Sequence, residues 1–185
     1  MEIALDRTYR VYRFLLDDVI GYGSALVMFA SVILAIAEII RRYILGVVFD
    51  WGQDAVTYFT VAAIFLYFAV TQARRSHLAV TAVLDALRVK GYTKTVLVLR
   101  LIVTAGSLAL YSTIVYWGYP TIERSMLLER STQSMVLLIW PFQLILLIGF
   151  TLSAVTCLFQ LYQDIQAVRG KTVFAWAPAE EGLEI

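Results

Sequence analysis

Long runs of apolar residues alternate with short polar stretches along the chain. Four runs are long enough to cross a hydrocarbon core of about 30 Å as helices, which takes about 20 residues. They cover approximately residues 19–40, 55–73, 101–122 and 134–161. None of them alternates apolar and polar positions as a barrel strand does, and a helix satisfies its own backbone hydrogen bonds in lipid. The pattern therefore predicts an all-α integral membrane protein with four transmembrane helices.

Two segments outside these runs have the pattern of amphipathic interfacial helices. The first, residues 3–16, contains charge pairs at i,i+4 spacing, which stabilise a helix. These pairs are Asp6–Arg10 and Arg13–Asp17. Its apolar residues Val11, Tyr12 and Leu15 are predicted to face lipid. The second, residues 77–90, lies in the most basic loop and is predicted to lie along the membrane surface.

The distribution of basic residues predicts the orientation. Eleven of the 15 Lys and Arg residues lie in the N-terminal segment, the second loop and the C-terminal tail. Basic loops stay in the cytoplasm, so both termini are expected to be cytoplasmic. We therefore expect an amphipathic cytoplasmic segment over residues 1–18, a four-helix membrane domain over 19–163 and a cytoplasmic tail over 164–185.

Composition excludes several classes of protein. The chain is 61% hydrophobic and 16% charged, whereas a typical soluble domain is about 45–50% apolar and about 25% charged. A net charge of +1 is too small to attract the phosphate backbone of a nucleic acid, so no nucleic-acid partner is expected. The single cysteine, Cys157, excludes a disulfide within the chain.

The polar residues offer little chemistry, so we expect no enzyme activity and no catalytic, cofactor-binding or metal-binding residue. The single histidine, His77, cannot supply a bis-histidine haem site, and no phosphate-binding loop of the Walker type is present. Glu38 is an acid within a span, and Arg41 and Arg42 follow it at i+3 and i+4, which predicts an ion pair at the membrane boundary. Two alternatives remain: Glu38 is the proton carrier of a small exporter acting as a homo-oligomer, or the chain anchors a redox complex.

Polar and aromatic residues gather at the ends of the spans and form the candidate subunit-interface or structural set. Snorkelling arginines and interfacial tryptophans account for some of them, and attachment to a partner is the functional interpretation. The set consists of Glu38, Arg41, Arg42, Tyr43, Trp51 and Asp54 at the outer ends, Arg74, Arg75 and His77 at the inner end, and Trp140 and Pro141 in the fourth span. Pro141 is expected to kink that span or to mark its entry.

The order and spacing of these motifs resemble the small membrane subunit, of the DctQ type, of tripartite ATP-independent periplasmic (TRAP) transporters. The matching motifs are Arg42-Tyr43, Trp51, His77-Leu-x-Val80, Gln133-Ser134, Trp140-Pro141 and Gly149-Phe150. Asp54 stands where the family usually has Glu, which keeps the charge, and Thr81 stands where it usually has Asp, which removes it. The resemblance covers approximately residues 15–162.

The resemblance implies a scaffold subunit in the bacterial inner membrane, surrounded by lipid and paired with a much larger elevator-type subunit. That large subunit would contain the substrate site and the sodium sites, so no cofactor is expected in this chain. A periplasmic binding protein would deliver an organic acid.

The apolar third loop, which includes Met126, Leu127 and Leu128, either enters the headgroup region or contacts another protein.

Overall fold

Helices make up most of the described chain. The computed structural model describes residues 2–75, 86, 87, 89, 93–134 and 136–174. The helices are α1 (Glu2–Phe14), α2 (Gly21–Ile40), α3 (Gly52–Ala73), α5 (Thr93–Leu127) and α6 (Trp140–Val168), with π-helical segments η1 (Leu15–Ile20) and η2 (Arg41–Leu45). Among the described residues, extended pairing is limited to one isolated bridge between Ser131 and Leu138.

The first four segments form one unbroken helix. α1, η1, α2 and η2 follow one another without a gap from Glu2 to Leu45. A π-helical turn takes up extra residues without ending the helix, which is why the chain passes from the amphipathic segment into the first span. The helix ends at Gly46, which has a φ of 66° that glycine adopts without a Cβ penalty.

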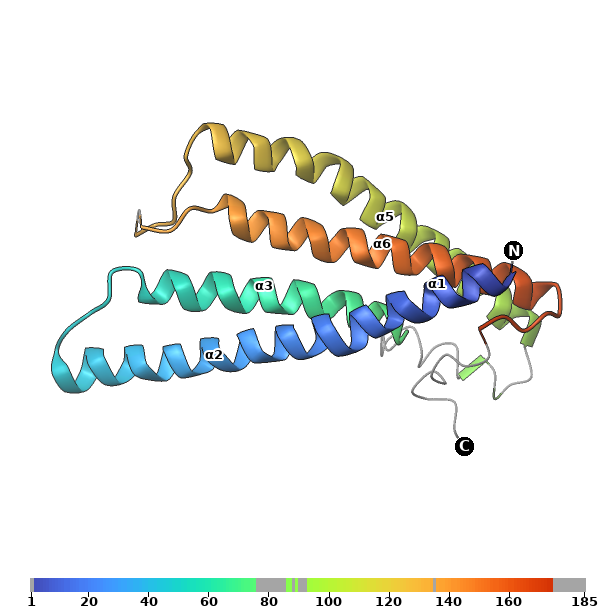
Figure 1. Cartoon of the computed structure of the whole chain (residues 1–185), viewed down its shortest axis with the longest axis horizontal. Helices are drawn as coiled ribbons and strands as arrows, with labels where there is room; N and C mark the ends of the chain where they lie inside the picture. The colour runs from blue at the N-terminus through green and yellow to red at the C-terminus, as the bar shows by residue number, and fades with distance from the viewer. Residues whose placement is uncertain (1, 76–85, 88, 90–92, 135, 175–185) are drawn as a thin grey trace.

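The membrane helices lie side by side in the order α2, α3, α6, α5 (Figure 1). α3 packs between α2 and α6, and α6 packs against α5, so α2 and α5 form the two edges of the array. We call the end where α3 and α6 begin the loop end, and the end where they terminate the cluster end. At the loop end, α2 with η2 extends beyond the first turns of α3 and α6 (Figure 1).

Within the described residues, four helices are long and apolar enough to cross a membrane, which confirms the predicted all-α fold with four transmembrane helices. They are Leu5–Leu45, Gly52–Ala73, Thr95–Leu127 and Trp140–Val168. The cytoplasmic placement of both termini stays a prediction. Of the interfacial helix predicted over residues 77–90, residues 86, 87 and 89 are helical, and the rest lie outside the described residues.

Helix ends differ from the predicted spans where polar residues continue a helix past its apolar run. α5 extends the predicted 101–122 span at both ends. α6 begins at Trp140 rather than near residue 134, because Pro141 fits the first turn of a helix. α6 also continues to Val168, so Asp164 lies in this helix and not in a tail.

The amphipathic segment packs more closely than its pattern predicts. The predicted pairs Asp6–Arg10 and Arg13–Asp17 are present, at 3.7 and 2.9 Å. The prediction that Tyr12 faces lipid is wrong, because its hydroxyl donates to the carbonyl of Leu152 at 2.6 Å and contacts Thr156 Oγ1 at 2.9 Å. A tyrosine hydroxyl at this depth needs a hydrogen-bond partner, and α6 supplies one.

Small residues let the helices approach closely, as is typical of membrane helix pairs. A Cβ at Gly149 of α6 would clash with the backbone carbonyl of Phe65 in α3. Ala62, Ala63 and Ala69 of α3 are buried at the helix contacts. The α3–α6 contact therefore depends on backbone surfaces as well as on side chains.

Candidate functional site

A buried aspartate joins three helices at the cluster end. Asp164 of α6 is 3% exposed. Its Oδ1 lies 2.8 Å from Nη1 of Arg75, which follows α3, and 3.0 Å from Nε of Arg100 in α5. Thr104 of α5 donates to its other oxygen at 2.8 Å. The buried carboxylate is paired with two guanidinium groups from different segments. The aspartate therefore holds α3, α5 and α6 together.

A second aspartate extends this arrangement to the N-terminal helix. Asp17 in η1 pairs with Arg13 at 2.9 Å and with Arg74 at 3.2 Å. Arg74 is adjacent in sequence to Arg75, so the end of α3 connects both aspartates. We call the six residues the ion-pair cluster: Arg13, Asp17, Arg74, Arg75, Arg100 and Asp164.

Arg75 reaches Asp164 through an unusual backbone conformation. Its φ is 52°, in the left-handed region that residues other than glycine rarely adopt. Such a conformation costs about 1–3 kcal/mol and persists when surrounding contacts determine it. Here those contacts are the ion pair with Asp164 and a hydrogen bond from Nη2 to the Gln160 carbonyl at 3.2 Å.

A hydrogen-bonded pair of glutamines lies next to the cluster. Gln72 Nε2 donates to Gln160 Oε1 at 3.0 Å and to Cys157 Sγ at 3.2 Å. In return, Gln160 Nε2 donates to the Gln72 carbonyl at 2.7 Å, and the Tyr111 hydroxyl donates to Gln72 Oε1 at 3.2 Å. These partners satisfy the two buried amides within the protein, so the pair joins helices.

The loop end contains a different carboxylate contact between α2 and α3. Glu38 is 7% exposed, and Nη2 of Arg42 lies 2.9 Å from its Oε1, as predicted. Its Oε2 faces the first residue of α3, because a Cβ at Gly52 would lie 2.7 Å from it. A negative charge is favourable at the N-terminus of a helix, so Glu38 stabilises the start of α3. Arg41 does not join this pair but lies 3.6 Å from the centroid of the Phe49 ring.

A second carboxylate at the loop end holds the connection between α5 and α6. Asp54 in α3 accepts hydrogen bonds from the Ser134 backbone N–H at 2.9 Å and from the Ser134 hydroxyl at 2.7 Å. The same connection is closed by the bridge between Ser131 and Leu138. Asp54 therefore attaches the α5–α6 connection to the first turn of α3.

Most of the residues that form the contacts at the two ends of the array lie in the segment that matches a known family. Residues 31–167 match the model described as "Tripartite ATP-independent periplasmic transporters, DctQ component". The chain belongs to the DctQ family. It is accordingly a small membrane subunit of a TRAP transporter, as the motif order predicted. No curated protein and no solved structure matches the chain.

The structure of this DctQ chain places five of the eleven predicted candidates in polar contacts. Glu38 with Arg42, Asp54 with Ser134, and Arg74 and Arg75 with the aspartates form contacts between elements. Trp140 and Pro141 begin α6, so Pro141 marks an entry. Tyr43 and Trp51 are exposed, at 80% and 37%. His77 lies outside the described residues.

Sequence reasoning missed the central members of the cluster. Asp164 was assigned to the tail, and Arg100 was counted as a loop cation. Gln72 and Gln160 were not singled out, because an amide inside an apolar run shows no partner in sequence. A usable signal existed: Arg75, Arg100 and Asp164 each lie just beyond an apolar run, at what becomes the same end of the array.

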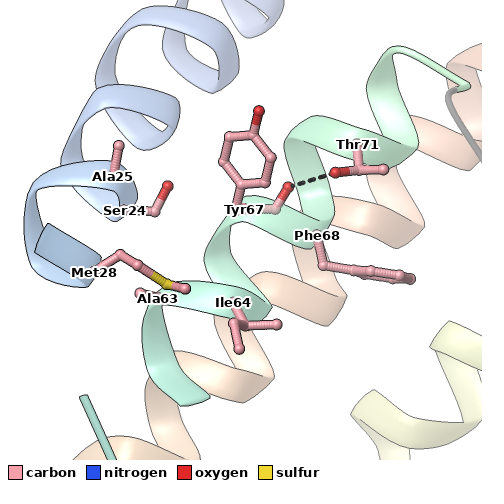
Figure 2. Close-up of a pocket in the computed structure, with 8 residues that line it drawn as sticks. All are labelled: Ser24, Ala25, Met28, Ala63, Ile64, Tyr67, Phe68 and Thr71. Atoms are coloured by element: carbon pink, nitrogen blue, oxygen red, sulfur yellow. Dashed lines mark hydrogen bonds between the residues drawn. The ribbon is translucent and has the colours of Figure 1, made fainter. Parts of the chain in front are cut away.

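An apolar groove lies between α2 and α3, in the half of these helices nearer the cluster end. It has a volume of about 420 Å³ and is lined by residues that include Ser24, Met28, Ala63, Tyr67 and Thr71 (Figure 2). The Ser24 and Thr71 hydroxyls donate to carbonyls of their own helices, at 2.9 and 3.2 Å. Because these hydroxyls are already bonded, the groove offers hydrocarbon and little polar recognition to a ligand.

Proposed function

We propose that this DctQ chain is the stationary scaffold of a sodium-coupled importer in the bacterial inner membrane. It pairs with a large elevator-type membrane subunit that contains the substrate and sodium sites. A periplasmic binding protein delivers an organic acid to that pair. The chain itself needs no cofactor, and lipid surrounds its remaining surface.

One observation carries this proposal: the buried aspartate and the two buried glutamines of the described spans bond to other helices. Asp164 bridges α3, α5 and α6, and Gln72 and Gln160 satisfy each other. A transporter that works alone usually keeps ionisable or unwound polar groups near the bilayer midplane for its solute. A scaffold requires helices fixed against one another, and buried polar networks provide this.

The position of Glu38 also favours a scaffold over an exporter. The carboxylate lies at the loop end of α2, where it pairs with Arg42 and faces the start of α3. These contacts fix it away from the middle of the span. If the chain is a scaffold, vesicles containing it should show only background proton-driven efflux, and Glu38→Gln should not change that background. If the chain shows measurable efflux and Glu38→Gln abolishes it, the result would support the exporter.

The test is purification of the tagged chain in mild detergent from its native host, followed by mass spectrometry. The scaffold predicts a large multi-span membrane protein in near-equal amount. It also predicts no solute uptake into vesicles that contain this chain alone, and uptake once the large subunit and the binding protein are added. Uptake by the chain alone, or purification as a homo-oligomer without a large partner, would contradict the proposal.

A further inference from the structure

The apolar groove between α2 and α3 is confined to one half of the membrane. On α3 it extends from Ala63 to Thr71. Ala63 lies eleven residues from Gly52 and eleven from Arg74, which is the middle of the span. A helix rises about 1.5 Å per residue, so the groove and the turn up to Arg74 cover about 16 Å, close to half of a core of about 30 Å. The fatty-acid chain of a phospholipid reaches this far, whereas a transmembrane helix of another protein crosses both halves.

A cation continues the groove at the cluster end. Four residues of α3 follow one another at steps of four, four and three positions: Ala63, Tyr67, Thr71 and Arg74. This spacing places them on one face of the helix. The first three line the groove, and Arg74 follows within one turn. Nε of Arg74 pairs with Asp17 at 3.2 Å, so the cation lies where α3 meets the helix that continues into α2.

Among the described residues, the charge of Arg74 is only partly compensated. Its partner Asp17 also pairs with Arg13 at 2.9 Å, so one carboxylate serves two guanidinium groups. The side chain of Arg74 is 40% exposed and that of Arg13 is 5% exposed, so the excess positive charge is accessible at Arg74. Basic pockets between transmembrane helices at the membrane surface bind the headgroups of anionic lipids, and guanidinium groups bind phosphate well.

The groove suits a hydrocarbon chain and has its polar end near Arg74. Its volume of about 420 Å³ falls in the range of about 300–1,000 Å³ that is typical of ligand sites. The side chain of Tyr67 extends along the groove toward the Thr71 end (Figure 2). A tyrosine in a membrane keeps its ring in hydrocarbon and directs its hydroxyl toward the polar surface. The direction of Tyr67 therefore agrees with a headgroup at Arg74 and a chain that extends inward from it.

We infer that an anionic phospholipid binds this chain from the leaflet at the cluster end, with one fatty-acid chain in the groove between α2 and α3 and its phosphate on Arg74. This inference goes beyond the proposed function and does not depend on it, because every contact comes from this chain. The apolar lining holds the fatty-acid chain, and Arg74 supplies the preference for a negatively charged headgroup over a zwitterionic one.

Native mass spectrometry of the purified full-length protein in detergent tests the headgroup contact. The protein is titrated with phosphatidylglycerol, or with phosphatidylcholine that has the same fatty-acid chains. We expect phosphatidylglycerol to bind more tightly, and Arg74→Gln to reduce this preference roughly fivefold. The control Arg10→Gln removes a cation that is 64% exposed and pairs with Asp6, and it should retain the preference. Equal binding of the two lipids by wild type, or an equal loss in both variants, would overturn the inference.

A second variant tests the groove and leaves the ion pairs intact. Ala25 of α2 is exposed and lines the groove, so Ala25→Phe fills the space without removing a charge. The control is Ala105→Phe, which places the same ring at an exposed position of α5. We expect Ala25→Phe to lose the bound phosphatidylglycerol and the control to keep it, at equal melting temperatures. Retention of the lipid by Ala25→Phe would show that its chain does not lie in the groove.

Photocrosslinking in native membranes distinguishes a lipid from a protein as the occupant of the groove. Ile64, which lines the groove and is 50% exposed, is replaced by benzoylphenylalanine. We expect a covalent product with a phospholipid, identified by its mass. A product with another protein, or with a second copy of this chain, would contradict the lipid assignment.

Discussion

The two ends of the helix array use carboxylates in different ways. At the cluster end, Asp164 and Asp17 each compensate two arginines, and Asp164 is almost fully buried. At the loop end, Glu38 faces the start of a helix and Asp54 accepts from one serine. Removing an aspartate at the cluster end leaves two partly buried arginines without their anion, whereas removing a carboxylate at the loop end releases a local connection. Global stability should therefore depend on the cluster end, and local order on the loop end.

The largest effect is expected for Asp164→Asn. The amide keeps the shape but leaves Arg75 and Arg100 without their anion, and breaking a buried ion pair costs about 3–5 kcal/mol. Thermal unfolding of the purified complex in detergent measures this loss. Asp6→Asn is the matched control, because its partner Arg10 is 64% exposed and such surface pairs contribute less than about 1 kcal/mol. Equal melting temperatures for both variants would mean that the cluster does not dominate stability.

A smaller loss is expected where the helices touch through backbone. Gly149→Ala places a methyl group against the Phe65 carbonyl of α3, and forced displacement of packed helices costs about 1–3 kcal/mol. The control is Gly106→Ala in α5, where a Cβ meets nothing within 4 Å. That change should be neutral or stabilise by about 0.5–1 kcal/mol, because alanine favours a helix over glycine. The pair is compared by thermal unfolding, and a Gly149→Ala variant as stable as wild type would argue against close α3–α6 contact.

Tyr12→Phe should reduce the free energy of unfolding by less than Gly149→Ala does. It removes the hydroxyl that bonds the Leu152 carbonyl and Thr156, and one such hydrogen bond contributes about 0.5–1.5 kcal/mol. Hydrogen exchange of α1 amides would report the loosening of this helix from α6. The control, Tyr22→Phe, changes an exposed ring on the α2 edge and should leave exchange unchanged. Identical exchange in both variants would place Tyr12 outside the α1–α6 contact.

The smallest global effect is expected at the loop end. Asp54→Asn weakens the acceptor for Ser134, so the α5–α6 connection should open while the melting temperature stays close to wild type. Limited proteolysis after Arg130, which lies in this connection, should then become faster. Ser134→Ala should produce the same change, since it removes the hydroxyl donor. A large drop in the melting temperature of either variant would show that the loop end, like the cluster end, determines global stability.

The sequence was sufficient for the fold class because span length and charge clustering follow directly from bilayer thickness. It also predicted the pairing of Glu38 with Arg42, because partners four residues apart on one helix are neighbours whatever the tertiary structure. Contacts between helices were not predictable in this way. Asp164 and Arg100 are 64 positions apart, and only the order α2, α3, α6, α5 brings their helices together.

The exact helix ends and the directions of side chains could not be predicted either, because they depend on which helices pack against each other. Tyr12 was placed toward lipid because amphipathicity identifies an apolar face but does not say whether lipid or another helix covers it. Asp164 was assigned to a tail because the apolar run ends before it, although the helix does not. In both cases a polar group is accommodated by a partner on a distant segment.

The unbroken helix from Glu2 to Leu45 has a mechanical consequence. Its 44 residues form a rod of about 66 Å, roughly twice the thickness of the hydrocarbon core. Asp17 attaches this rod to the end of α3 through Arg74, and Glu38 faces the start of α3 at Gly52. A tilt of the rod relative to α3 would therefore strain the contacts at both ends of the span.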